Sequence, residues 1–200
     1  DDGFAPSLKT RRSGRSDEIL IWGNILPYKG VLEFISSPAV RVAGLNVRIV
    51  GRCKDPGMAK DIEKAVAECD SVEFVGSYSN GSESLRSKII FENRAADFDE
   101  LASLVSSSKF VLFPYLPGSV SSSGVLMDTL AMGGNPVGPA VGAFADLSRE
   151  NVCFVYGSEA EMIEILKSDR SVNPGVLRDF IARNTWHSYA KFFADFFAVR

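Results

Sequence analysis

Short apolar runs alternate along the chain with segments whose apolar residues repeat at helical spacing. The runs predict strands, most of which are continuous in apolarity and close on glycine or proline. Such strands are typical of a parallel sheet covered on both faces, so the pattern predicts an α/β fold with a Rossmann-like doubly wound sheet. The predicted strands are residues 18–22, 46–50, 72–75, 88–91, 110–113, 136–137 and 152–155, and the helices are 30–35, 58–69, one capped by Asp97, and 124–132.

From residue 159 to the end the pattern is wholly helical. The last helix carries an aromatic stripe formed by Trp186, Tyr189, Phe193, Phe196 and Phe197. Core packing explains most of this stripe, and an interface with another domain is the interpretation of the surplus. The polar stretch 1–17 is typical of an arm or linker. We therefore divide the chain into an arm at 1–17, a sheet domain at 18–170, and C-terminal helices at 171–200.

Composition agrees with one globular domain, since 46% of the 200 residues are hydrophobic and 24% are charged. The net charge of -3 makes a nucleic-acid partner unexpected, because such domains carry a basic surplus. The three cysteines lie far apart, so we expect free thiols and neither a metal nor another cofactor. No apolar run approaches the roughly 20 residues of a transmembrane helix. We expect a cytoplasmic protein, with peripheral attachment to the inner face of the membrane as the alternative.

Three loops are candidate ligand sites, because open parallel sheets bind ligands beyond the carboxyl ends of their strands. They are residues 23–30, 51–57 and 115–124. In the third, a serine run at 121–123 precedes Gly124 where a helix begins. A helix start carries about half a positive charge and several unpaired N–H groups, which suits a diphosphate. A serine cap that binds nothing is the alternative.

Two basic residues lie in the other loops. Lys29 stands at the start of the first predicted helix, where its charge opposes the helix dipole, and this misfit favours contact with a phosphate. Arg52, directly after the second strand, is a weaker candidate for the same role. A solvated side chain is the alternative for both. The loops match neither the dinucleotide-binding nor the P-loop glycine motif, which weakens dehydrogenase and nucleotide-hydrolase functions.

Six short motifs follow one another over about residues 18 to 170. They are Trp22-Gly-Asn-Ile-Leu-Pro-Tyr-Lys-Gly30, Arg48-Ile-Val-Gly51, Phe98-Asp-Glu-Leu101, Phe113-Pro-Tyr115, Ser123-Gly-Val-Leu126 and Gly134-Asn-Pro-Val137. This ordered set resembles the C-terminal domain of group 1 (GT4-type) glycosyltransferases, which have the GT-B fold. The tail Asn184-Thr-Trp-His-Ser-Tyr-Ala190 resembles the closing helix of that family, which packs toward the N-terminal domain.

The resemblance implies that residues 18–170 bind a nucleotide-diphosphate sugar without a metal. Lys29 matches the family lysine that neutralises the leaving diphosphate, and is the implied catalytic residue. Arg94 falls in the loop near the base. The implied nucleotide-sugar site comprises Gly23, Asn24, Lys29, Gly51, Arg52, Arg94, Ser121, Ser122, Ser123, Gly124, Val125 and Asp128.

The chain departs from the family pattern in two features. Many members carry an arginine shortly before the lysine, where this chain has Asn24 and Leu26. Many also carry two glutamates eight positions apart, the second of which grips the ribose. Here Ser121 and Thr129 stand at those positions, and the prediction gives the ribose to the neighbouring Asp128.

The predicted function is transfer of a sugar from a nucleotide-diphosphate sugar to a glycan or lipid-linked acceptor, as in polysaccharide biosynthesis. Retention of the anomeric configuration is implied by the resemblance alone. In the family the acceptor binds to an N-terminal domain, so we expect a donor-binding half with a separate acceptor-binding partner.

Two alternatives stay open. A nucleotide-sugar epimerase would need a catalytic histidine and carboxylates in the crevice, and the only histidine, His187, lies in the terminal helix, where a surface position is favoured. A non-catalytic nucleotide-sugar-binding module would explain the departures at Asn24, Leu26 and Thr129.

Overall fold

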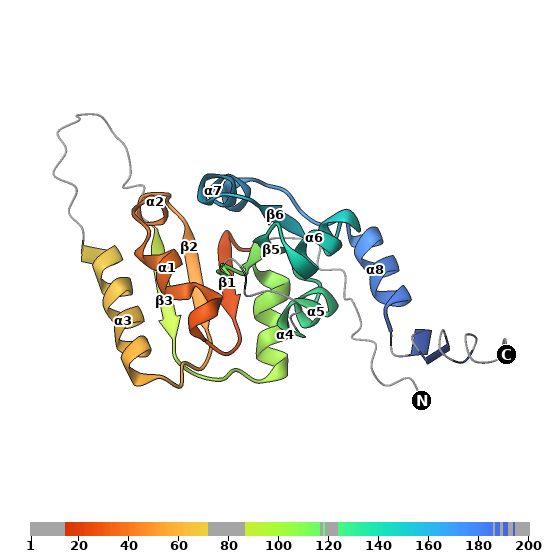
Figure 1. Cartoon of the computed structure of the whole chain (residues 1–200), viewed down its shortest axis with the longest axis horizontal. Helices are drawn as coiled ribbons and strands as arrows, with labels where there is room; N and C mark the ends of the chain where they lie inside the picture. Colours follow the sequence, from red (N-terminus) through yellow and green to blue (C-terminus); the bar gives the residue numbers. More distant parts are fainter. Residues whose placement is uncertain are drawn as a thin grey trace.

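The computed structural model describes residues 15–71, 87–116, 118, 124–185, 187–188, 190–191 and 194. In this part of the chain six parallel strands form one sheet in the order β3-β2-β1-β4-β5-β6 (Figure 1). The predicted α/β fold with a doubly wound parallel sheet is therefore confirmed. The strands are β1 (Glu18–Trp22), β2 (Asn46–Val50), β3 (Lys88–Glu92), β4 (Phe110–Leu112), β5 (Pro136–Pro139) and β6 (Phe154–Tyr156).

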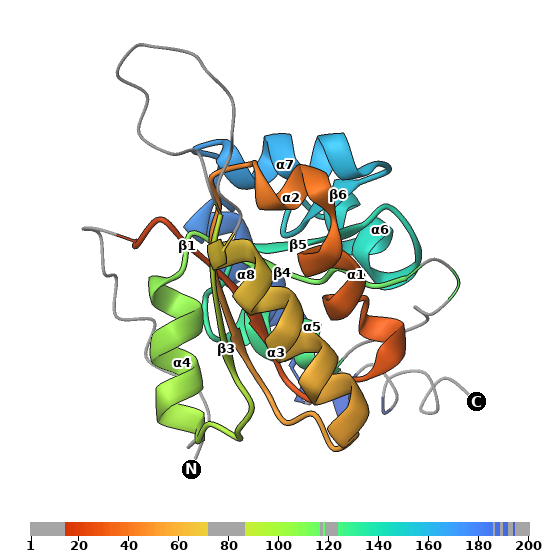
Figure 2. The ribbon, with the colours of Figure 1, turned by 90° about the vertical axis from the view of Figure 1, so that its left-hand side faces the viewer.

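Helices cover both faces of the sheet, and Figure 2 shows α1 and α4 on opposite sides of the strands. We call the two sides the α1 face and the α5 face. The α1 face carries α1 (Val31–Ser36), α2 (Pro38–Arg41), α3 (Pro56–Ser71) and α7 (Glu159–Lys167). The α5 face carries α4 (Phe98–Ser107), α5 (Gly124–Ala131), α6 (Gly142–Arg149) and α8 (Pro174–Arg183).

Strand β1 explains why the strands of this chain are continuous apolar runs. Ile19 and Ile21 belong to the core of the α1 face, whereas Leu20 and Trp22 belong to the core of the α5 face. All four side chains are at most 9% exposed. Because successive side chains of a strand point to opposite faces and both faces are covered, no position in β1 after Glu18 favours a polar residue.

The direction of winding reverses between β1 and β4, which are neighbours in the sheet. From β1 the chain moves outward through β2 to β3, and from β4 it moves outward the other way through β5 to β6. The segments that follow β1 and β4 therefore leave a shared edge of the sheet in different directions. Ligands of open α/β sheets bind at this kind of position.

The observed elements agree with the predicted ones except at some boundaries. Asp97 caps α4, as predicted, by accepting a hydrogen bond of 2.9 Å from the Glu100 backbone N–H. The last strand begins later than predicted, at Phe154, because that residue is the first to pair with β5. Two short helices, α2 and α6, and a 3-10 turn before α1 were not predicted.

Some predictions concern residues outside the described part of the chain. These are the strand at 72–75, the serine run at 121–123, most of the arm at 1–17 and the aromatic stripe of the last helix, at 186, 189, 193, 196 and 197. The division into an arm, a sheet domain and C-terminal helices stays a prediction.

Candidate functional site

Four segments follow the carboxyl ends of β3, β2, β1 and β4, and hydrogen bonds join them in series. Between the first two, the Asn93 side-chain carbonyl accepts a bond of 2.9 Å from the Cys53 backbone N–H. The Ile25 N–H donates to the Arg52 carbonyl at 3.0 Å, and the Leu116 N–H donates to the Tyr28 carbonyl at 3.0 Å. These bonds fix the segments relative to one another, so groups that they carry are held in place before any ligand arrives.

Two glycines allow the segments to approach so closely. A Cβ atom on Gly51 would lie 1.9 Å from the Gly23 carbonyl oxygen, and a Cβ atom on Gly30 would lie 2.0 Å from the Pro114 carbonyl oxygen. Gly30 also has a φ of 64°, which side-chain-bearing residues rarely adopt. Any other residue at either position would push the edge segments apart.

Lys29 is enclosed where these segments meet. It ends the 3-10 turn η1 (Pro27–Lys29), and its side chain is only 6% exposed. Its ammonium nitrogen lies 5.8 Å from the centre of the Tyr115 ring, and 3.4 Å from the point that a Cβ on Gly23 would occupy. The same point lies 3.3 Å from a methyl group of Val125, the second residue of α5. The lysine thus lies beside the start of α5.

The ammonium group has no counter-ion in the part of the chain that the structure describes. Among the described residues, Lys29 makes no hydrogen bond or ion pair, and no buried side-chain nitrogen or oxygen lacks a partner. The nitrogen must therefore keep some access to solvent. Burial lowers the pKa of Lys29, because desolvation disfavours its charged form. A cation held in this way is suited to receive an anion from outside.

The position of Lys29 differs from the predicted one. It does not open α1, because Gly30 occupies the cap position of that helix and α1 begins at Val31. The expected misfit with the helix dipole is therefore wrong as a reason for choosing this residue. Burial without a carboxylate partner is the feature that distinguishes Lys29.

The start of helix α5 lies beside this lysine, since Val125 and the Lys29 ammonium both approach Gly23. Leu126 and Leu130 are buried against the α5 face, whereas Gly124 and Asp128, one turn apart, are exposed. No acidic residue lies in the first turn, and no described atom lies within 4 Å of the point that a Cβ on Gly124 would occupy. The helix start therefore offers its partial positive charge to the same space as Lys29.

Thr129 faces away from this space. Its side chain is fully buried, and its hydroxyl donates to the Val125 carbonyl at 2.8 Å and accepts from the Trp22 indole N–H at 3.0 Å. The residue at the position of the second family glutamate is therefore part of the core, and its hydroxyl proton is already donated within the protein.

The remaining predicted basic residues differ in their surroundings. Arg52 is exposed beside Gly51 and has no side-chain partner among the described residues. Arg94, at the end of β3, forms ion pairs with Glu100 and, at 2.6 Å, with Glu92. Hydrogen bonds to these carboxylates raise the pKa of Arg94. The guanidinium of Arg94 is thus engaged within the protein, one strand farther from Lys29 than Arg52.

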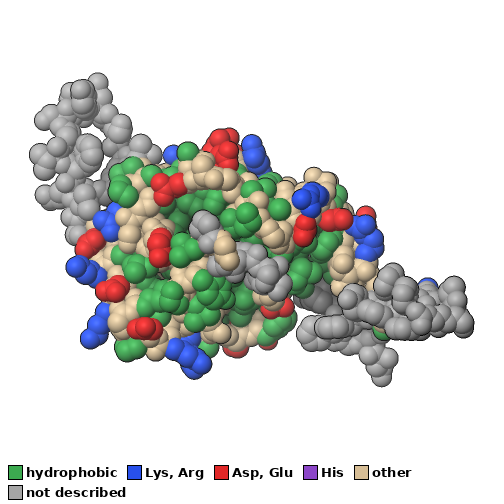
Figure 3. All heavy atoms as spheres, in the orientation of Figure 1, with side chains coloured by type: hydrophobic (Ala, Val, Ile, Leu, Met, Phe, Trp, Pro, Cys, Tyr) green, Lys and Arg blue, Asp and Glu red, His purple; other side chains and the backbone are tan. Residues whose placement is uncertain are grey.

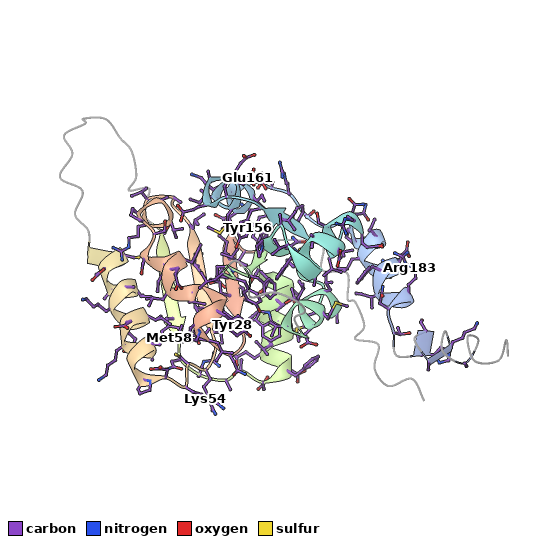
Figure 4. The ribbon with its side chains drawn as sticks, in the orientation of Figure 1. Tyr28, Lys54, Met58, Tyr156, Glu161 and Arg183 are labelled. Carbon is purple, nitrogen blue, oxygen red and sulfur yellow. The ribbon has the colours of Figure 1, made fainter. Side chains whose placement is uncertain are left out.

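The described part of the site therefore brings together Gly23, Lys29, Gly124 and Val125, with Asn24 and Arg52 beside them. Sequence reasoning gave no role to Tyr115, although this residue opens the candidate loop 115–124 and ends the Phe113-Pro-Tyr115 motif. It also missed Asn93, and no sequence signal pointed to that residue. Tyr28, labelled in Figure 4, is the middle residue of η1 and packs edge-on against Tyr115, with ring centres 5.9 Å apart.

Other candidate groups lie elsewhere or are inaccessible. His187 is exposed, and Cys53, Cys69 and Cys153 are buried free thiols. Within the described ranges there is no group of three His, Cys, Asp or Glu residues that could hold a metal ion. No helix in those ranges is long and apolar enough to cross a membrane.

Solved structures match this fold, although no protein-family model and no curated protein matches the sequence. The C-terminal domain of the group 1 glycosyltransferase LpcC from Francisella tularensis matches with a TM-score of 0.52 and 20% identity, over 74% of this chain and 72% of that one. AviGT4, a glycosyltransferase of avilamycin A biosynthesis, matches with a TM-score of 0.60 and 18% identity, over 92% of this chain and 51% of that one.

A UDP-forming α,α-trehalose-phosphate synthase from Burkholderia vietnamiensis matches with a TM-score of 0.66 and 14% identity, over 93% of this chain and 44% of that one. This chain thus spans about half the length of the two larger enzymes. The matches show the class of the fold, which is a Rossmann-like domain of the GT-B type. More particularly, the fold is similar to that of the C-terminal domain of the group 1 glycosyltransferase LpcC, the family that the ordered motifs resemble.

Proposed function

We propose that this chain is the donor-binding half of a glycosyltransferase that moves a sugar from a nucleotide-diphosphate sugar to a glycan or lipid-linked acceptor. The observation that carries the proposal is the environment of Lys29. The residue is only 6% exposed, its ammonium nitrogen lies beside the start of α5, and it lacks a carboxylate partner among the described residues. A buried charge without a partner is costly, so its retention is best explained by an anionic ligand.

The chemistry of glycosyl transfer suits this arrangement. The bond between the anomeric carbon and the diphosphate breaks, and negative charge develops on the leaving diphosphate. In our proposal Lys29 and the backbone N–H groups at the start of α5 stabilise that charge, as fixed donors do in other enzymes. The hydrogen bonds between the edge segments keep the cation in position, so little reorganisation accompanies the reaction. This proposal uses no metal ion.

The other site residues take binding roles in the proposal. Gly23 and Val125 form the wall beside the phosphates, and the hydroxyls of Ser121, Ser122 and Ser123 contact them. Asp128, exposed one turn after Gly124, accepts hydrogen bonds from ribose hydroxyls. The description of the trehalose-phosphate synthase as UDP-forming supports a nucleoside diphosphate as the leaving group.

A second unit would cover the same edge of the sheet and bind the acceptor. Large apolar side chains are exposed in segments that follow strand ends: Leu26 is 39% exposed, Met127 43% and Val141 45%. Apolar side chains also gather on the lower half of the face in Figure 3, the half where Figure 4 labels Tyr28 and Met58. Exposed apolar groups of this kind favour contact with another protein surface.

A non-catalytic binding module is the second candidate. Its support is Thr129, which stands where the family carries its ribose-binding glutamate. Thr129 is buried and hydrogen-bonded to Trp22, so it does not take that role. A module of this kind would bind the nucleotide sugar but would not release the diphosphate when a suitable acceptor and an acceptor-binding unit are supplied.

Titration calorimetry with UDP, GDP and ADP and their glucose conjugates tests the donor site. We expect the nucleotides of one of the three bases to bind with a dissociation constant below about 1 mM. Lys29→Met should weaken that binding by at least about tenfold. Absence of binding by every nucleotide at millimolar concentration would contradict the donor site. Binding that Lys29→Met leaves unchanged would contradict only the role of the lysine.

A further inference from the structure

Four aromatic rings pack together near the carboxyl ends of β1 and β4. Tyr115, which is 7% exposed, contacts the rings of Tyr28, Phe113 and Phe144, with ring centres 5.9, 5.6 and 5.7 Å away. All three contacts are close to edge-on, at interplanar angles of 81°, 83° and 89°. Edge-on contacts are among the favoured arrangements of aromatic pairs. The ring of Tyr115 is therefore held by three others.

Hydrogen bonds fix the backbone on both sides of Tyr115. The Tyr156 hydroxyl, at the end of β6, donates a bond of 3.1 Å to the Phe113 carbonyl. Burial raises the pKa of Tyr156, so this hydroxyl keeps its proton at neutral pH. On the other side, the Leu116 N–H donates to the Tyr28 carbonyl at 3.0 Å. Tyr156 and Tyr28, both labelled in Figure 4, thus anchor the segment that carries Tyr115.

The ammonium group of Lys29 lies over the face of this fixed ring. Its nitrogen is 5.8 Å from the centre of the Tyr115 ring, within the roughly 6 Å at which an aromatic face attracts a cation. The attraction arises because the face of an aromatic ring carries partial negative charge. It favours the charged form of the amine, and so offsets part of the desolvation that lowers the pKa of Lys29.

An aromatic face differs from a carboxylate in what it leaves available to a ligand. A carboxylate would neutralise the ammonium, accept its hydrogen bonds and repel an incoming phosphate. A tyrosine ring has no net charge at neutral pH and does none of these. Since Lys29 has no ion pair among the described residues, its charge is held near the ring without being cancelled.

We propose that Tyr115 is the positioning residue of Lys29: its ring takes the place of a carboxylate partner, and holds the ammonium group with its charge available to the leaving diphosphate. The inference rests on the proposed function and specifies how the cation of that site is held. Tyr115 acts through the lysine and needs no contact with the ligand. The other three rings and the Tyr156 hydroxyl keep Tyr115 in place.

Substitutions of Tyr115 test the proposal by calorimetry with whichever of UDP, GDP and ADP binds the unaltered protein most tightly. Tyr115→Phe keeps the ring, so its affinity should stay within about twofold. Tyr115→Leu removes the ring and should weaken binding by about threefold to thirtyfold, the range of cation–π contacts. Phe154→Leu is the matched control, because it removes a different edge-on ring, 5.8 Å from that of Phe110, and should leave nucleotide binding unchanged.

Fluorinated phenylalanines at position 115 separate the charge of the ring face from its shape. Each added fluorine withdraws electrons from the face, so affinity should fall stepwise from phenylalanine to its trifluoro derivative. In the Lys29→Met background the same series should be flat, and Tyr115→Leu should cost no further affinity, because the ring acts only through the ammonium. The series keeps the packing of the cluster, so it decides the question even if Tyr115→Leu fails to fold.

Three results would overturn the assignment alone: unchanged binding by Tyr115→Leu, equal losses in Tyr115→Phe and Tyr115→Leu, or a flat fluorine series in the presence of Lys29. A further loss from Tyr115→Leu in the Lys29→Met background, or a comparable loss in Phe154→Leu, would show that the ring acts through general packing and would overturn it as well. If the unaltered protein binds no nucleotide at millimolar concentration, the proposed function fails and this inference fails with it.

Discussion

The indole nitrogen of Trp22 donates a hydrogen bond of 3.0 Å to the hydroxyl of Thr129. This bond joins the end of β1 to the middle of α5, within the core of the α5 face. It fixes the helix whose first turn lies beside Lys29, and it uses the side chain of Thr129 for structure. The departure from the family at this position therefore has a structural role in this chain.

Replacement of Thr129 by valine tests that role. Valine keeps the shape but leaves the buried Trp22 N–H without its acceptor, so we expect a loss of about 1 to 3 kcal/mol in the free energy of unfolding. Trp22→Phe combined with Thr129→Val should cost less than the sum of the two single changes, because both remove the same bond. Denaturant unfolding measures all three variants. Additive costs would contradict the coupling.

Lys29 is expected to lower stability in the absence of a ligand. Lys29→Met removes a desolvated charge without a carboxylate partner and keeps an apolar stem of similar length. The variant should unfold at a higher temperature than the unaltered protein, by roughly 2 to 4 °C for each kcal/mol gained, while it loses nucleotide binding. Lys54→Met, at an exposed position, should change neither property. A lower midpoint for Lys29→Met would indicate that the ammonium is satisfied within the protein.

The lowered pKa of Lys29 predicts how binding and stability depend on pH. Nucleotide binding should fall as pH rises through the pKa of the folded protein, below the usual value of 10.5, because the neutral amine no longer attracts a phosphate. Between the lowered pKa of the folded protein and 10.5, the unfolded chain keeps the lysine proton that the folded chain has lost. The contribution of Lys29 to the free energy of unfolding therefore rises with pH over this interval. The stability difference between Lys29→Met and the unaltered protein should therefore shrink toward pH 10.5.

Comparison with Lys29→Met isolates this effect, since other buried groups are common to both proteins. One is Cys153, whose pKa burial raises to about 12. A stability difference that stays constant from pH 7 to 10.5 would contradict a lowered lysine pKa. Binding that persists unchanged to pH 10.5 would contradict an electrostatic role for the ammonium.

The close contact between Gly51 and Gly23 should be intolerant of a side chain. Gly51→Ala brings a Cβ to 1.9 Å from a carbonyl oxygen, so the segments after β1 and β2 must separate, at a cost of about 2 to 4 kcal/mol. Gly124→Ala is the control, because the corresponding space is open among the described residues, and its stability should change by less than about 0.5 kcal/mol. Chemical denaturation compares the two. Equal stabilities would mean that the close approach is not needed for folding.

Much of the fold follows from local patterns in the sequence. The apolar runs at residues 18–22 and 46–50 coincide with β1 and β2, since burial on both faces leaves a continuous apolar signal. Asp97 was recognised as a cap because its interaction with the Glu100 N–H spans only three residues. Helix α2 was missed because four residues are too few to establish a helical period.

The candidate site was only partly predictable. The glycines at 23, 30 and 51 and the lysine at 29 belong to motifs that are visible in the sequence. The bond from Cys53 to Asn93 joins residues 40 positions apart, and no local pattern encodes such a contact. Arg52 appeared as a basic residue after a strand, but its position opposite Asn24 depends on the register of two strands.

The sequence alone was thus enough to predict the order of the strands, most of the helices, the doubly wound class and several residues at the edge of the sheet, because these depend on side-chain periodicity and on backbone freedom at glycine. Tertiary contacts were needed to show that Lys29 is enclosed without a carboxylate partner among the described residues, and that Thr129 is hydrogen-bonded to Trp22 in the core. They also decided that Arg94 is engaged by Glu92 and Glu100. Burial and pairing are properties of segments brought together from distant parts of the chain, so no single stretch of residues contains them.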